Sequence, residues 1–425
     1  MTADLEQLDF FSDPSLLEDP YPYFEHLRSK CPVTAIPHHG VVAISGYDEA
    51  TEIYRDVETF SSCNSVVGPF AMFPEPLEGD DVSEIIDRYR PQLPMNEHMV
   101  TMDPPEHTQE RALLMRLLSP KRLKQNEEFM WRLADRQLEE FLADGRCEFI
   151  GAYSQPFAML VVADLLGVPE SDFARFREGF GLVGTAGELG DEEGPGLNAL
   201  AWLDDYFATY IEERRAEPRT DVLTDLALAK YPDGSTPDVT AVVRTATFLF
   251  AAGQETTARL LATALKYLAE YPELQDELRE HRERIPDFIE EALRIESPVK
   301  ADFRLARRAK TVGGVDIEAG TPVMLLNGAA NRDPRRFDCP AEFRLDRPNA
   351  KDHIAFGRGH HACPGGPLAR AEGRISVERI LGRMRDIRLS EDHHGPAGAR
   401  RFAYEPTWVL RGLHDLHIEF MPVNA

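Results

Sequence analysis

The pattern of apolar and polar positions predicts a mostly helical chain with a few short strands. The longest helical pattern begins at Thr236-Pro237, an N-cap followed by a first-turn proline, and runs to Tyr271-Pro272. Residues 246–252 in its middle are apolar on nearly all sides, so this helix should cross the core. A second helix is expected from about Pro286 to Glu296, ending before Pro298.

Short apolar runs outside these helices predict strands. The candidate strands are Val41–Ile44, Val315–Ile317, Val323–Leu326 and Leu416–Phe420. Gly313-Gly314 and Ala319-Gly320 indicate turns among them. Residues 66–97 and 181–196 are the most irregular stretches and are expected to be long loops. Because no linker, repeat or low-complexity tract divides the chain, we expect one domain over residues 1–425, mainly α with small β-sheets.

Composition and charge narrow the possible functions. The net charge of −26 argues against a nucleic-acid partner. The N-terminal residues carry no long apolar run, so neither a secretory signal nor a membrane anchor is expected. The five cysteines are scattered and odd in number, without disulfide or zinc spacing. These features predict a cytoplasmic protein without a membrane, and we also expect a monomer.

One cysteine is distinguished by its surroundings. Cys363 lies in the run Phe356-Gly-Arg-Gly-His-His-Ala-Cys-Pro-Gly-Gly366. Glycines let backbone N–H groups approach a sulfur closely, and Pro364 fits the first turn of a following helix. A helix N-terminus favours the ionised sulfur. The loop therefore suits a thiolate presented to a metal, although an arbitrary cysteine in a loop is more often a buried structural thiol.

The middle of the long helix breaks local rules. Ala252-Gly253-Gln254-Glu255-Thr256-Thr257 places a glycine and a polar cluster inside an apolar helix. Gly253 costs about 1 kcal/mol of helix propensity, and a buried Glu255 needs partners. Thr256 can hydrogen-bond the carbonyl one turn back and open a kink. The cluster indicates either a functional site or a kink that serves packing.

The two motifs together resemble those of the cytochrome P-450 family. The pattern Phe-x-x-Gly-x-x-x-Cys-x-Gly, from Phe356 to Gly365, resembles the family's haem-ligand signature, and the helix motif resembles its oxygen-activation motif. The resemblance covers the chain from about Asp13 to Phe420. It implies the cytochrome P-450 fold of the soluble bacterial type, with haem b between the long helix and the cysteine loop, and Cys363 as axial ligand.

The resemblance also implies roles for further residues. Thr256 would hydrogen-bond dioxygen at the iron, Glu255 would help relay protons, and Ala252 and Gly253 would leave room above the iron. The residues expected to hold the haem propionates are His107, Arg111, Arg304 and His361. A structural network would join Glu291, Arg294 and Arg347. Neither Lys300 nor Asp302 can be assigned to the pocket, the haem edge or an outside salt bridge.

The reaction implied is monooxygenation, a hydroxylation or epoxidation of a small hydrophobic organic substrate by O2 and two electrons. The chain lacks a flavin or Gly-x-Gly-x-x-Gly fingerprint, so a ferredoxin and its NAD(P)H-dependent reductase should deliver the electrons. Between Pro364 and Arg388 lie six arginines and three acidic residues, a local net charge of +3. This stretch indicates either a dock for an acidic electron-transfer protein or an ordinary solvated helix face.

The substrate pocket should be apolar and partly aromatic, which favours a hydrophobic ligand. The candidate lining residues are Phe70, Phe73, Phe180, Phe248, Val299 and Trp408. Each of them could equally be ordinary core. Two other functions remain open: a peroxide-driven haem-thiolate peroxygenase, whose relatives usually lack the Glu255-Thr256 pair, and a non-catalytic haem-binding protein, which would be expected to lose Thr256.

Overall fold

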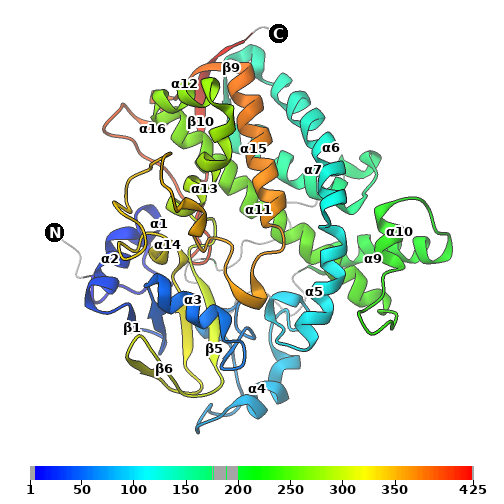
Figure 1. The fold of residues 1–425 in the computed structure, drawn as a ribbon, viewed down its shortest axis with the longest axis vertical. Helices are drawn as coiled ribbons and strands as arrows, with labels where there is room; N and C mark the ends of the chain where they lie inside the picture. Colours follow the sequence, from blue (N-terminus) through cyan, green and yellow to red (C-terminus); the bar gives the residue numbers. More distant parts are fainter. Residues whose placement is uncertain (1–4, 175, 177–187, 189–199, 424–425) are drawn as a thin grey trace.

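The computed structural model describes residues 5–174, 176, 188 and 200–423. A sheet-rich part, with the N-terminal helices α2 and α3 beside β5 and β6, lies opposite a helical part that contains α5, α6, α7, α9 and α10 (Figure 1). The helices in the described part are α1 Ser15–Glu18, α2 Tyr21–Lys30, α3 Tyr47–Arg55, α4 Ser83–Tyr89, α5 Glu106–Leu117, α6 Pro120–Glu139, α7 Gln155–Leu166, α9 Ala201–Ala216, α10 Val222–Ala227, α11 Val239–Glu270, α12 Pro272–Glu280, α13 Ile285–Ile295, α14 Asn327–Ala330, α15 Gly366–Arg383 and α16 Glu391–His394.

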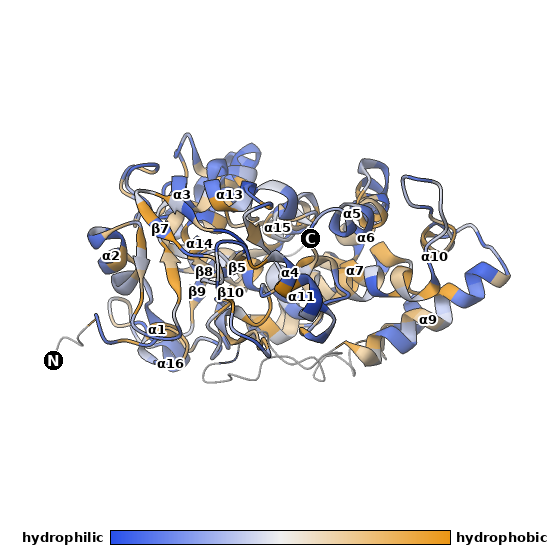
Figure 2. Cartoon of the chain, turned by 90° about the horizontal axis from the view of Figure 1, so that it is seen from below, coloured by the Kyte–Doolittle hydropathy of each residue, from blue (hydrophilic) through white to orange (hydrophobic). Residues whose placement is uncertain are grey.

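Helix α11 is the predicted long central helix. It packs against α7, α9, α13 and α15. Its N-cap is Asp238, whose carboxylate accepts a hydrogen bond from the backbone N–H of Ala241 at 2.6 Å. The prediction of Thr236 as the cap is therefore wrong by two residues, because an aspartate cap stands after Pro237. Figure 2 shows α7, which packs against α11, as largely apolar, in agreement with its almost complete burial.

The strands form three small sheets. Their bounds are β1 Val33–Ala35, β2 Val42–Ile44, β3 Phe60–Ser61, β4 Arg146–Glu148, β5 Asp302–Ala306, β6 Lys310–Val312, β7 Val315–Ile317, β8 Pro322–Leu325, β9 Met384–Leu389 and β10 His417–Pro422. The largest sheet has the order β1-β2-β8-β5-β3, with β2 and β8 parallel and the other pairs antiparallel. The register of β5 on β8 pairs Asp302 with Leu325 and Arg304 with Val323.

Two predicted loops differ from the structure. Residues 66–97 contain the 3-10 turn Gly68–Phe70, helix α4 and the 3-10 turn Arg90–Gln92, so this stretch is not one long loop. The second loop, 181–196, lies outside the described residues except for Glu188, which forms a bridge with Thr407. Among the described helices, none has the length and apolar character needed to cross a bilayer.

Candidate active site

Cys363 lies in a tight loop between two glycine turns and α15. The backbone N–H of Cys363 donates to the carbonyl of Phe356 at 2.8 Å, which closes the loop. Gly359 has φ +69, and a Cβ there would lie 2.3 Å from the carbonyl oxygen of Tyr54, so only glycine fits. Helix α15 begins at Gly366 with Pro367 in its first turn. The prediction that Pro364 occupies that turn is wrong, since Pro364 precedes the helix.

The Cys363 sulfur lines an interior space. The residue is exposed, yet burial is the main influence on its thiol and raises its pKa. A side chain on the wall of an internal cavity can be both accessible to solvent and surrounded by protein, which explains the two observations. The backbone N–H groups of Gly365 and Gly366 and the Arg111 guanidinium act in the opposite direction and lower the pKa. Two backbone N–H groups and one guanidinium charge thus favour the thiolate, the form of cysteine that binds a metal.

Two histidines and one arginine with unpaired nitrogen atoms converge beside the cysteine loop, near Arg304. The ring centroids of His107 and His361 lie 3.9 Å apart. Within the described residues, four buried nitrogen atoms have no hydrogen-bond partner: both ring nitrogens of His107, Nε2 of His361 and Nη1 of Arg111. Burial first, and then the positive charges of Arg111 and Arg304, lower the pKa of His107 to about 4. Unpaired donors and like charges in one place fit a dianionic group such as the two propionates of haem.

Both arginines of this region also bond within the chain. Arg111 Nη2 donates to the carbonyl of Ala362 at 2.7 Å, which ties α5 to the cysteine loop. Arg304 Nη1 donates to Asp302 at 3.1 Å. Asp302 therefore lies at the Arg304 side of the site. Lys300 instead faces the N-terminal aromatic cluster, with its Nζ 5.9 Å from the centroid of Phe10.

The residues of the α11 motif, 252–257, do not all face the same space: Ala252 and Gly253 point to different surroundings. Thr256 Oγ1 donates to the carbonyl of Ala252 at 2.9 Å, the bond one turn back that the sequence predicts. Ala252 is exposed although α11 is interior, so it borders a space. Gly253 faces α7 instead, where a Cβ would lie 2.9 Å from Val162 Cγ2. Close helix packing thus gives a reason for this glycine that the sequence does not reveal.

Glu255, Arg259 and Glu405 form a row of alternating charges. Its carboxylate accepts from Arg259 Nη1 at 3.2 Å, and Arg259 Nη2 donates to Glu405 in the C-terminal segment. Burial raises the pKa of Glu255, Arg259 opposes this rise, and Glu405 adds to it. Gly412 leaves the room that Arg259 needs, because a Cβ there would lie 2.5 Å from Arg259 Cγ. Sequence reasoning missed Arg259, although its position four residues after Glu255 was a usable signal.

The predicted structural network forms around one buried carboxylate. Glu291 and Arg294 are both fully buried, and two hydrogen bonds of 2.8 Å join them. Arg347 Nε donates to the same carboxylate at 2.9 Å. Arg294 and Arg347 also donate to backbone carbonyls of residues 331–342, so the network holds the segment that leads to the cysteine loop.

Comparison with known proteins decides the family. A sequence model described as cytochrome P450 matches residues 196–385. The chain is 35% identical over 404 residues to cytochrome P450 144 of Mycobacterium tuberculosis, covering 92% of this chain and 88% of that protein. The chain belongs to the cytochrome P450 family. Its members are monooxygenases that bind a thiolate-ligated haem.

Solved cytochrome P450 structures share this fold over nearly the whole chain. The substrate-free Mycobacterium marinum cytochrome P450 CYP150A6 has a TM-score of 0.93 and 61% identity, covering 99% of this chain and 100% of that one. CYP109E1 of Bacillus megaterium, solved in complex with testosterone, has a TM-score of 0.77 and 28% identity, covering 94% and 99%. The predicted fold class is therefore confirmed.

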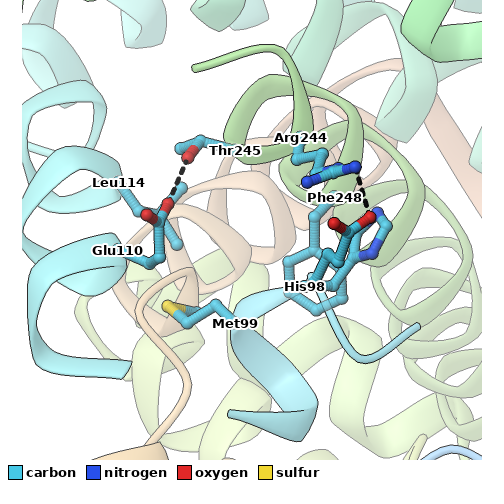
Figure 3. A pocket seen from close by; sticks show the side chains of 8 residues that line it. His98, Met99, Glu110, Leu114, Arg244, Thr245 and Phe248 are labelled. Atoms are coloured by element: carbon cyan, nitrogen blue, oxygen red, sulfur yellow. Dashed lines mark hydrogen bonds and ion pairs between the residues drawn. The ribbon is translucent and has the colours of Figure 1, made fainter. Parts of the chain in front are cut away.

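The predicted substrate-pocket residues of this P450 do not lie in one cluster. Phe248 lies on α11 next to His98, with ring centroids 6.1 Å apart (Figure 3). Phe70 and Trp408 pack instead with Phe11, and Trp408 is almost fully buried. Phe73 packs on a separate core cluster that contains Val82, Ile86 and Leu93. Val299 forms a bridge with Leu410. Phe180 lies outside the described residues.

The arginines that follow the cysteine loop are mostly paired within the P450 itself. Five of the six have acidic partners: Arg370 with Glu290, Arg374 with Glu127, Arg379 with Asp135, Arg383 with Glu139 and Arg388 with Glu419. Three of these acidic residues lie on α6. Because α6 neutralises much of this charge, the local excess of arginine does not by itself make a basic dock.

Proposed function

We propose that this cytochrome P450 hydroxylates or epoxidises a small hydrophobic organic molecule with O2 and two electrons from a ferredoxin. When bound, the thiolate-ligated haem supplies the activation of O2. Cys363 would hold the iron. The residues that would hold the propionates are His107, Arg111, Arg304 and His361.

The observation on which the proposal rests is the row of three charged residues next to Thr256, namely Glu255, Arg259 and Glu405. Glu405 is 23% exposed in its side chain, Arg259 is 6% exposed, and Glu255 completes the series next to Thr256. A monooxygenase must bring protons from water to its reaction site, and Arg259 here joins two partly exposed carboxylates, Glu405 and Glu255, whose side chains are 23% and 20% exposed. We assign Glu255 to proton transfer and the Thr256 hydroxyl to positioning of the proton at the reacting oxygen.

The electron donor is inferred from the sequence of the chain. Without a flavin or dinucleotide fingerprint, electrons come from a separate protein, and a ferredoxin with an NAD(P)H-dependent reductase supplies this chemistry. The proposal includes a cytoplasmic enzyme, on the grounds of its scattered cysteines. It also includes one domain over the whole chain, since a similar solved structure covers 99% of it.

The ligands in two related solved structures suggest which chemical class of substrate to expect. The testosterone complex of CYP109E1 shows that P450 with a neutral polycyclic ligand. P450BioI, which is 26% identical to this chain, was solved with a fatty-acyl group carried on acyl carrier protein. For this chain we propose a ligand of comparable hydrophobic character, a steroid-like or long-chain molecule.

Reconstitution tests the proposal. The holoenzyme is given a hydrophobic substrate, O2, NADPH, a ferredoxin and its reductase, and products are analysed by mass spectrometry with 18O-labelled O2. We expect product that carries one labelled oxygen atom and depends on the ferredoxin. Product formed with hydrogen peroxide alone, and none with the ferredoxin system, would establish the peroxygenase alternative instead.

A further inference from the structure

A small pocket lies beside α11, a short distance along the helix from the oxygen-activation motif. It is lined by residues of three segments: Glu97, His98 and Met99, then Glu110 and Leu114 of α5, then Arg244, Thr245 and Phe248 of α11. Figure 3 shows the imidazole of His98 beside Phe248, with the carboxylate of Glu110 on the opposite side. None of the family motifs includes these residues, and only Phe248 among them was predicted from the sequence to line the substrate pocket.

His98 is a buried polar side chain without a partner. It is 4% exposed, and neither ring nitrogen has a hydrogen bond within the described part of the chain. Its backbone is fixed, because its N–H donates to the carbonyl of Met95 at 2.9 Å and its carbonyl accepts from Thr101. A buried polar group left unpaired costs about 1–3 kcal/mol, so a ligand that pairs with His98 recovers this cost.

The electrostatics of the pocket select a neutral ligand. Burial, and then Arg244, lowers the pKa of His98 to about 4, so the ring is uncharged at neutral pH and offers one donor and one acceptor. Arg244 is already paired with Glu97. The carboxylate of Glu110 accepts from Tyr231 at 2.6 Å and from Thr245 at 3.4 Å. The described lining of the pocket therefore has two carboxyl groups and no unpaired cation, which disfavours an anion.

The spacing along α11 sets the length of the ligand. Phe248, Ala252 and Thr256 follow one another at intervals of four residues and share one face of the helix. Eight residues of α-helix rise about 12 Å. A molecule with its reacting carbon beside Thr256 and an extended apolar body would bring its far end to Phe248 and His98.

We infer that His98 is a specificity-determining residue that hydrogen-bonds a neutral oxygen group, a hydroxyl or a ketone, at the far end of an elongated hydrophobic substrate. The inference rests on the proposed function, because the substrate's other end is assigned to the site of oxidation. It adds a defined chemical feature to the substrate: one uncharged oxygen about 12 Å from the carbon that reacts.

Ligand binding to the holoenzyme tests the inference without any electron donor. The probes are decan-1-ol, 1-fluorodecane, which lacks the hydroxyl, and decanoate, which is charged. Binding is followed by the spin-state change of the haem and by calorimetry. We expect decan-1-ol to bind about ten-fold tighter than either other probe, the value of one buried hydrogen bond. Decanoate binding tighter than decan-1-ol, or a spectrum showing the hydroxyl on the iron, would overturn the inference.

Variants separate hydrogen bonding from shape. In His98→Phe the advantage of decan-1-ol over 1-fluorodecane should disappear, whereas His98→Gln should keep part of it, because glutamine also donates and accepts. His281→Phe, at an exposed histidine, should behave as the wild type. An unchanged preference in His98→Phe contradicts the inference. Because these are binding measurements, they stand even if turnover with a ferredoxin fails.

Discussion

Arg259 joins two carboxylates that belong to distant parts of the chain. It bonds Glu255 one helical turn earlier and Glu405, which is 146 residues away. Since one guanidinium serves both, the charge of Glu405 bears on the proton affinity of Glu255, and the pKa of Glu255 is raised by burial first and by Glu405 as well.

Removing the charge of Glu405 should therefore lower the pKa of Glu255. Glu405→Gln removes a negative charge that raises the pKa of Glu255. Arg259 then has Glu255 as its one charged partner of the two and still lowers that pKa. We expect the acidic limb of the pH profile of product formed per electron consumed to move to lower pH. The measurement is the ratio of product to NADPH across pH, with Glu419→Gln, a surface pair with Arg388, as control. A profile that stays in place would show that Glu405 does not act on Glu255.

The Thr256 hydroxyl should matter for coupling more than for folding. Thr256→Ala removes the donor to Ala252 and the group assigned to proton positioning. We expect the product formed per electron to fall by roughly ten-fold or more, with electrons diverted to peroxide or water. Thr256→Ser should retain most coupling, and Thr257→Ala, at the buried neighbour, serves as the matched control. Full coupling in Thr256→Ala would refute the assigned role.

At the residue scale, functional residues could be predicted where they lie close together in the sequence. Glu255 and Thr256 are adjacent, and Cys363 and its glycines lie within one loop, so their chemistry was visible in the pattern. Glu405 and Gly412 were not predictable, because only the fold brings them to Arg259. The apolar pocket residues were the weakest predictions, since a phenylalanine in a core and one in a pocket have the same pattern.

Helix α11 is held close to α7 by the absence of a side chain. At Gly253 a Cβ would approach Val162 Cγ2 to 2.9 Å. Gly253→Ala would gain about 1 kcal/mol of helix propensity but would overpack a buried contact, at a cost of about 1–3 kcal/mol.

We expect Gly253→Ala to lower the thermal unfolding temperature of the holoenzyme slightly. Combining it with Val162→Ala should cost less than the sum of the two single changes, because the smaller side chain makes room for the new methyl group. Calorimetric unfolding of the four proteins measures this coupling. Strict additivity would mean that α7 and α11 do not meet at these residues.

At the element scale, hydrophobic periodicity predicted the long helix and four strands, and it failed where polar residues interrupt a buried strand. β5 carries Asp302 and Arg304 within an otherwise apolar run, so its pattern does not indicate a strand. Its pairing with β8 supplies the missing context. The first turns of α11 and α15 were misplaced because more than one residue near each start can cap a helix.

One buried arginine near the C-terminal end, Arg411, pairs with the carboxylate of Glu296 and also bonds backbone carbonyls near the N-terminal end. Arg411 Nε donates to Glu296 at 2.6 Å, and its other nitrogens donate to the carbonyls of Leu17 and Glu18 at 2.9 and 3.2 Å. Burial alone would raise the pKa of Glu296, but Arg411, Lys266 and Arg332 outweigh it and lower the pKa to about 2.

This pair should make stability depend on acid. A carboxylate whose pKa is lower in the folded chain stabilises it above the ordinary value of 4.5, and this contribution is lost as the pH falls from there toward 2. Glu296→Gln should lose about 3–5 kcal/mol at neutral pH, because Arg411 stays buried without its partner. Its free energy of unfolding should also vary less than that of the wild type between pH 5 and pH 3. Equal slopes would contradict the pKa of Glu296.

At the scale of the whole molecule, net composition was a poor guide to local charge. The arginines after the cysteine loop were expected to be either a dock or a solvated face, and the fold instead sets acidic residues of α6 against them. The sequence cannot show this, since α6 and α15 are more than two hundred residues apart. The electron donor must therefore be identified by binding and turnover.

The central claim is that Cys363 is the thiolate ligand of the haem iron. The most direct measurement is the absorption spectrum of the reduced, CO-bound protein. The wild type and Cys339→Ala, at another exposed cysteine, should show the strongly red-shifted Soret band of a thiolate-ligated haem, and Cys363→Ala should lose it. A red-shifted band that persists in Cys363→Ala would contradict the account.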